Sequence, residues 1–189
     1  DMLDVSTFLA LTRQRTATIP VALYMHENQL TYPWSPSDKD VALKRDNHYS
    51  FINYTSALAA DKVFFNSAYH KNSFLQALPH LLQQFPDYQN KASIATIAQK
   101  SKVLPLGVDL QRFDKYKIAK KNTHKPLLIW NHRWEYDKNP TGFFEQLFHL
   151  SANSYDFELA VLGEQFAQSP AIFAEAKQRL TPHIVHWGY

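Results

Sequence analysis

The chain has 189 residues, of which 45% are hydrophobic and 20% are charged, a balance that allows a buried core and argues against a disordered segment. The formal net charge of +3 permits a polyanionic partner but does not require one. The absence of cysteine excludes a disulfide framework and a cysteine-based zinc site.

The first half of the chain alternates helical and strand patterns. Helical patterns predict helices at 2–15, 51–61 and 69–78. Short apolar runs predict buried parallel strands at 21–25 and 62–65, and a strand that runs into a glycine turn at 101–109. Two prolines predict a loop at 30–37.

The middle of the chain is basic, with five lysines in 115–125. We interpret this segment as an exposed linker between an N-terminal domain at 1–114 and the start of a second domain at 126–189. Contact of these lysines with RNA phosphates is the alternative. The second domain continues the alternation, with strands at 126–130, 157–164 and 183–187 and helices at 141–150 and 170–180.

This alternation is typical of an α/β fold with mostly parallel sheets. The second domain contains about three strands, fewer than a doubly wound half usually has, and it ends on a strand at Tyr189. The chain also begins with Asp1-Met2, so that methionine is in second place. We therefore expect a chain that was cut from a longer protein at both ends.

The loop after the predicted strand at 126–130 carries two cations, Arg133 and Lys138. In open α/β sheets, ligands bind beyond the carboxyl ends of the strands, and the helix N-terminus that follows favours anions. Arg133 and Lys138 could therefore clamp a diphosphate. The alternative is an ordinary pair of surface cations beside Glu135 and Asp137.

Polar residues also follow three other predicted strands. His26-Glu27-Asn28 follows the first strand, where a histidine could donate to a sugar hydroxyl or to a developing charge, or where the cluster could simply satisfy loop backbone groups. Asn66-Ser67 follows the second strand and could contact a ligand, although Ser67 is also well placed to cap the next helix. Gly163-Glu164 marks a further strand end in the same cleft, or a simple turn.

Several common sites are absent from the sequence. The chain has four glycines and neither a dinucleotide-binding fingerprint, a P-loop nor a nucleophile elbow, so phosphate contacts must come from side chains and helix ends. No metal site is expected, because Leu30 breaks a His-Glu-x-x-His pattern after His26, and His183 and His186 face opposite sides of a strand. No run approaches the roughly 20 apolar residues of a membrane span, and no basic leader opens the chain, so we expect a cytoplasmic protein without membrane contact.

Several strings together resemble one family, the tRNA-queuosine α-mannosyltransferases. These strings lie at 24–33, 59–68, 130–140, 160–164 and 186–189. The His-Glu-Asn string at 26–28 and the His-Arg-Trp-Glu string at 132–135 are specific to this family, whereas 105–113 resembles the interdomain segment of the wider class of retaining GT-B glycosyltransferases. The resemblance covers almost the whole chain.

The resemblance implies a GT-B fold of two Rossmann-like α/β domains, of which the second is incomplete here. It also implies a retaining transfer of mannose from GDP-mannose to queuosine at the wobble position of an aspartate tRNA, without a metal or another cofactor. By this resemblance His26 orients the donor sugar, Glu27 and Asn28 shape the pocket, and Arg133 and Lys138 bind the donor diphosphate. We place the remaining strand-end residues on the donor side as well, namely Asn66, Ser67, Gly163 and Glu164.

Two segments of that family are not found in the chain: an early Gly-Gly-Ser-His-type loop and a later Glu-x7-Glu segment that binds nucleoside and sugar. We therefore expect these 189 residues alone to be inactive. Two alternatives stay open, a GT-B glycosyltransferase with another acceptor and a non-catalytic nucleotide- or RNA-binding α/β module. The oligomeric state is not predicted.

Overall fold

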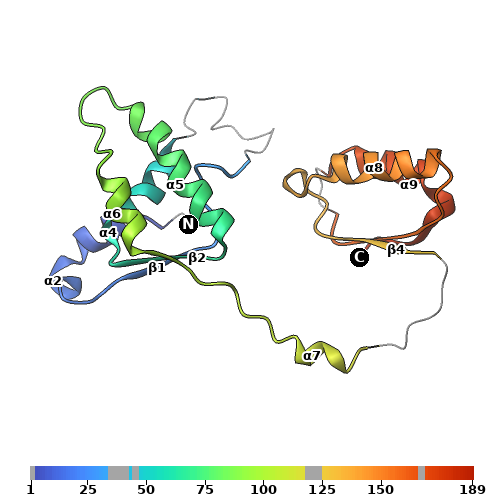
Figure 1. Ribbon diagram of the computed structural model, residues 1–189, viewed down its shortest axis with the longest axis horizontal. Helices are drawn as coiled ribbons and strands as arrows, with labels where there is room; N and C mark the ends of the chain where they lie inside the picture. Colours follow the sequence, from blue (N-terminus) through green and yellow to red (C-terminus); the bar gives the residue numbers. More distant parts are fainter. Residues whose placement is uncertain (1–2, 34–42, 44–46, 118–124, 166–168) are drawn as a thin grey trace. The chain divides into compact units, whose positions relative to one another are not determined.

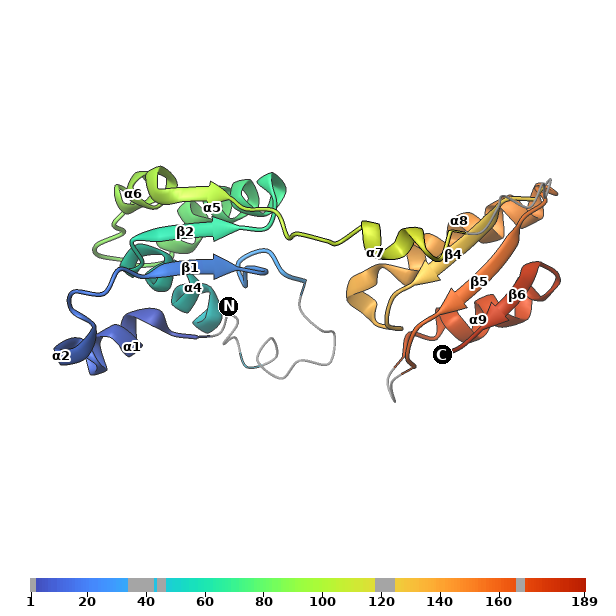
Figure 2. The ribbon, with the colours of Figure 1, turned by 90° about the horizontal axis from the view of Figure 1, so that it is seen from below.

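The computed structural model describes residues 3–33, 43, 47–117, 125–165 and 169–189. The chain forms two compact units, Asp1–Phe113 and Asp114–Tyr189. Each unit contains a three-stranded parallel sheet, and helices pack against the sheet in each unit (Figures 1 and 2). The fold is therefore of the mixed α/β class, as the sequence predicts, and the GT-B arrangement of two Rossmann-like domains stays a prediction.

The first sheet has the strand order β1-β2-β3. Its strands are β1 (Ala22–Met25), β2 (Lys62–Phe65) and β3 (Ser101–Val103). The helices of this unit are α1 (Val5–Leu11), α2 (Arg13–Thr16), α4 (His48–Ala59), α5 (Ala68–Gln83) and α6 (Ser93–Lys100), and α7 (Gln111–Asp114) follows at the unit's end. Helices α5 and α6 contact β2, and their fully buried side chains Phe74, Leu78 and Ile97 pack with Phe65 in the core.

The second sheet has the strand order β4-β5-β6. Its elements are β4 (Leu127–Asn131), η1 (Tyr136–Lys138), α8 (Pro140–Ala152), β5 (Glu158–Leu162), α9 (Ile172–Arg179), η2 (Thr181–His183) and β6 (Ile184–Trp187). Helices α8 and α9 lie side by side on one face of this sheet (Figures 1 and 2). The core beneath them is aromatic: Trp134 stacks on Phe173 with ring centres 4.6 Å apart, and Phe144 meets Phe173 edge-on at 5.1 Å.

Several predicted elements are confirmed with shifted bounds, and others are wrong. The single helix expected at 2–15 is two short helices, because the chain leaves the helical conformation at Thr12. Helix α5 continues through Pro79 to Gln83 because Leu81 and Leu82 are buried, so tertiary packing overrides the break that proline favours. Helix α6 is not predicted from the sequence. The strand expected at 101–109 ends at Val103.

Two predicted segments lie partly outside the described residues. These are the predicted loop, at 34–37, and the basic linker, at 118–124. Of the basic linker, the structure describes 115–117 and Lys125, whose ammonium pairs with Asp156 at 2.8 Å. Among the described residues, no helix has the length and apolar character needed to cross a membrane.

The aromatic core of the second unit gives a stability prediction. Phe173 is buried and touches Trp130, Trp134 and Phe144, so we expect Phe173→Ala to lower the free energy of unfolding by about 3–5 kcal/mol. Tyr155→Ala serves as the control, because Tyr155 is exposed and its loss should change stability by less than about 0.5 kcal/mol. Urea denaturation measures both, and equal effects would contradict this packing.

Candidate functional site

The carboxyl ends of the first sheet's strands lie side by side. In the parallel register Met25 pairs with Phe65, and Phe65 pairs with Val103. His26 and Asn66 are therefore the first residues beyond two neighbouring strands. This is the edge at which open α/β sheets bind ligands.

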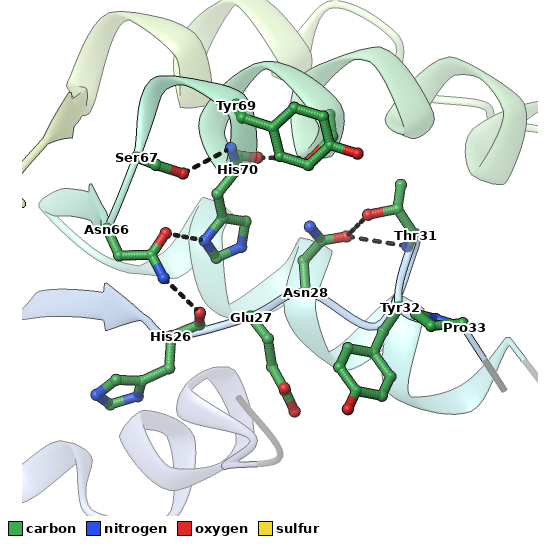
Figure 3. A pocket seen from close by; sticks show the side chains of 11 residues that line it. His26, Glu27, Asn28, Thr31, Tyr32, Pro33, Asn66, Ser67, Tyr69 and His70 are labelled. Carbon is green, nitrogen blue, oxygen red and sulfur yellow. Dashed lines mark hydrogen bonds between the residues drawn. The ribbon is translucent and has the colours of Figure 1, made fainter. Parts of the chain in front are cut away.

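Asn66 connects two of the residues at this edge. Its Nδ2 donates to the backbone carbonyl of His26 at 2.8 Å, and its Oδ1 lies 3.1 Å from Nδ1 of His70 (Figure 3). Because Nδ2 must donate to a carbonyl, Oδ1 must accept, so we assign the ring hydrogen of His70 to Nδ1. His70 is buried, and its ring packs edge-on against Phe65 at 5.0 Å. The end of β1 is thereby tied to the first turn of α5.

His26 is exposed, but its surroundings are ordered. Its ring lies edge-on to Tyr24, with ring centres 5.1 Å apart. The Tyr24 hydroxyl donates to the carbonyl of Leu104 at 3.0 Å, just beyond β3. The ring of His26 therefore packs against a tyrosine whose hydroxyl is fixed by the segment just after β3.

Asn28 organises the loop that follows. It is 4% exposed, and its Oδ1 accepts from the backbone N–H of Leu30 and Thr31 at 3.2 and 3.0 Å and from the Thr31 hydroxyl at 3.1 Å. Glu27 accepts from Gln29 Nε2 at 3.2 Å. These contacts satisfy loop groups, which is the alternative that the sequence left open for this cluster.

The five residues predicted at the ends of β1 and β2 line one pocket of about 350 Å³. They are His26, Glu27, Asn28, Asn66 and Ser67. Ser67 also caps α5, because its hydroxyl accepts from the His70 N–H at 3.1 Å, as predicted. The other residues that line this pocket are not predicted from the sequence: Thr31, Tyr32, Pro33, Tyr69, His70 and Ser73. Tyr69, His70 and Ser73 lie in the first two turns of α5. The helix predicted after Ser67 was the signal that could have identified them, because residues three and four apart on a helix lie on the same face.

In the second unit, Gly163 lets two strand-end loops touch. Its φ is +108°, and a Cβ there would lie 2.0 Å from the carbonyl oxygen of His132. The backbone carbonyl of the next residue, Glu164, accepts a hydrogen bond from the backbone N–H of Trp134 at 3.1 Å. Gly163 and Glu164 line a pocket of about 490 Å³, with Trp134, Gln165, Gly188 and Tyr189.

Arg133 and Lys138 do not line that pocket, and each pairs with an acidic neighbour. Arg133 lies 3.0 Å from Glu135, and Lys138 lies 2.6 Å from Asp137. The N-terminus of α8 is also capped by Asn139, whose Oδ1 accepts from the Gly142 N–H at 3.2 Å. Pro140 supplies no N–H. Fewer amides are therefore available for an anion than the sequence suggested, and the diphosphate clamp stays a prediction.

His183 and His186 have separate partners. His183 stacks on Phe157 at 4.0 Å, and its ring nitrogens lie 3.0 Å from the Phe157 carbonyl and 3.1 Å from the Ser151 hydroxyl. It lies in η2 rather than in the predicted strand. His186 instead contacts the Gly188 carbonyl at 3.1 Å. In the described part of the chain, no three His, Asp or Glu residues are grouped as metal ligands.

We expect Gly163→Ala to lower the free energy of unfolding by at least about 1–3 kcal/mol, because its backbone conformation is strained for alanine and the added methyl group meets the His132 carbonyl. Gly107→Ala is the control, since a Cβ at Gly107 meets nothing within 4 Å. Thermal and urea unfolding measure both variants. A Gly163 variant as stable as the Gly107 variant would show that the two loops do not touch.

The buried His70 should make stability depend on pH. Burial lowers the pKa of His70 below its ordinary value of 6.5, and a backbone hydrogen bond to Glu27 partly opposes this. Between the lowered pKa and 6.5, the unfolded chain binds more protons than the folded chain. The contribution of His70 to stability is therefore complete above pH 6.5 and decreases as the pH falls through the folded pKa.

Urea titrations from about pH 5 to 8, the range in which histidine titrates, test this dependence on the protein and on His70→Gln. We expect the free energy of unfolding to decrease less steeply with falling pH in the variant. Equal pH dependence in the two proteins would mean that His70 titrates as it does in water.

Comparisons with known proteins agree with the resemblance seen in the sequence. A family model described as the N-terminal part of tRNA-queuosine alpha-mannosyltransferase matches residues 1–108. A Drosophila melanogaster protein named tRNA-queuosine alpha-mannosyltransferase is 36% identical to the chain over an alignment of 174 residues, and the match covers 88% of this chain and 45% of that relative. The chain thus spans less than half of the relative's length. The family predicted from the sequence is confirmed, and the chain belongs to the tRNA-queuosine α-mannosyltransferases.

Proposed function

We propose that the full-length protein transfers mannose from GDP-mannose to queuosine at the wobble position of an aspartate tRNA, with retention of configuration. The support is family membership together with the pocket at the carboxyl edge of the first sheet, where five strand-end residues meet. No metal or other cofactor takes part in the proposed reaction. Because the chain covers 45% of its relative, we propose that these residues alone are inactive.

In the proposed reaction, the bond between the sugar's anomeric carbon and the diphosphate breaks while a bond to the acceptor hydroxyl forms. The leaving phosphate takes the hydroxyl proton, so no protein base is required. His26, exposed at the end of β1, would donate a hydrogen bond to the donor sugar as charge develops. Glu27 and Asn28 would hold the loop that walls the pocket.

The donor diphosphate would be held from the second unit. Arg133 and Lys138 would stabilise charge that grows on the diphosphate in the transition state, which is the kind of interaction that raises turnover. Each would exchange its present carboxylate partner for phosphate. Gly163 and Glu164 would line the donor pocket.

The transfer assay uses full-length protein, GDP-mannose and queuosine-containing tRNA, with mass spectrometry of the digested nucleosides. We expect queuosine to gain the mass of one hexose. GDP-glucose in place of GDP-mannose tests the donor, and tRNA that lacks queuosine tests the acceptor. An unmodified queuosine, in protein that binds GDP-mannose, would contradict the proposed acceptor and favour a GT-B enzyme with another acceptor.

In this assay, we expect Arg133→Ala and Lys138→Ala each to reduce turnover by on the order of 10²–10³-fold, the effect of removing one group that stabilises transition-state charge. Lys125→Ala is the matched control, because Lys125 is also paired with a carboxylate but lies before β4. Undiminished turnover in both test variants would rule out the clamp.

We expect His26→Ala to reduce turnover by about 10²-fold or more while its affinity for GDP stays close to that of the unaltered protein, because His26 is placed at the sugar. Calorimetry measures GDP binding. His149→Ala, at an exposed histidine in the last turn of α8, serves as control. A large loss of GDP affinity in His26→Ala would instead place His26 at the nucleotide.

A further inference from the structure

The first pocket has an aromatic rim that the proposed reaction does not use. Tyr69, the second residue of α5, lines this pocket and is 83% exposed. Figure 3 shows its ring projecting from α5, while Tyr32 reaches the same pocket from the loop after β1. The two rings come from different elements, and the Tyr69 ring buries little of its surface within the chain.

Exposure alone does not make Tyr69 a binding residue, since exposed tyrosines are ordinary. Tyr88 is 82% exposed in the same unit and lines none of the described pockets. What distinguishes Tyr69 is its place beside a pocket whose wall carries several hydrogen-bonding side chains. A planar apolar face beside hydrogen-bonding groups suits a ligand that is flat and has a polar edge.

The hydroxyl groups that line this pocket offer both hydrogen-bond donors and hydrogen-bond acceptors. Ser73 donates its hydroxyl hydrogen to the His70 carbonyl at 3.0 Å, so its oxygen can still accept from a ligand. The Ser67 hydroxyl oxygen accepts from the His70 N–H, so its hydrogen can be donated. Thr31 donates its hydroxyl hydrogen to Asn28, again with its oxygen available. These groups lie within a volume of about 350 Å³, within the usual range for small-molecule sites.

A nucleobase from single-stranded RNA has this combination of properties. Bases in loops are read by stacking on aromatic side chains together with hydrogen bonds to their edges. Bases from a loop can also be turned out of their stack into a pocket, as enzymes that modify bases require.

We propose that Tyr69 is the stacking platform for the acceptor base, so that the first pocket binds the nucleoside that receives the sugar. This inference rests on the proposed function. Ser67, which caps α5, and Ser73, in the second turn of that helix, would then contact the edge of the base. His26 would stand at the side of the pocket where the donor sugar arrives.

The test compares Tyr69→Ala, Tyr69→Phe and the control Tyr88→Ala in the full-length protein. The KM for queuosine-containing tRNA and the KM for GDP-mannose are measured separately. Loss of one base–aromatic stack should raise the tRNA KM of Tyr69→Ala roughly 5- to 150-fold and leave the GDP-mannose KM unchanged. Tyr69→Phe, which keeps the ring, should retain most of the affinity, and Tyr88→Ala should match the unaltered protein.

A tRNA KM that is the same in Tyr69→Ala and Tyr88→Ala would overturn the inference while leaving the proposed function intact. A rise confined to the GDP-mannose KM would also overturn it, because the ring would then belong to the donor site. If the unaltered protein transfers no sugar, the proposed function fails, and binding of a queuosine-containing anticodon stem-loop tests Tyr69 directly. Weaker binding by Tyr69→Ala than by Tyr88→Ala would still support the platform, and equal binding would overturn it.

Discussion

The candidate site depends on the two hydrogen bonds of Asn66. A polar residue after a buried strand is free to turn in several directions, but Asn66 is held on one side by the His26 carbonyl and on the other by the ring of His70. His70 is buried, and burial lowers the pKa of its ring, which favours the neutral form. The end of β1, the end of β2 and the start of α5 thereby form one wall.

The two units differ in how their strand ends are held. In the first unit, side-chain amides and hydroxyls hold the loops, and the exposed side chains of His26 and Tyr69 line the pocket. In the second unit, buried aromatic rings and a glycine contact hold the loop after β4. Its two cations, Arg133 and Lys138, are balanced by adjacent carboxylates. Phosphate would have to compete with these carboxylates, which a doubly charged ligand can do.

Sequence patterns predicted the strand ends because an apolar run followed by a polar residue marks both the strand and its edge. For this reason His26, Asn66 and the cap at Ser67 could be named from the sequence, whereas their grouping in one pocket needed the parallel register of β1 and β2. Helix α6 was missed because Ile97 is its one fully buried apolar side chain. The left-handed conformation of Asn139, which caps α8, has no clear sequence signal beyond the residue type. The roles of Tyr69 and His70 depend on helical position and side-chain direction, which an apolar pattern does not record.

We propose that the wobble nucleoside reaches the carboxyl edge of the first sheet. Photo-crosslinking tests this placement most directly, with a tRNA that carries 4-thiouridine next to queuosine, full-length protein, and mass spectrometry of the crosslinked peptides. We predict crosslinks to the segments 24–33 or 66–73, which line the first pocket. Crosslinks confined to 125–189, in a protein that transfers mannose, would contradict this account of the site.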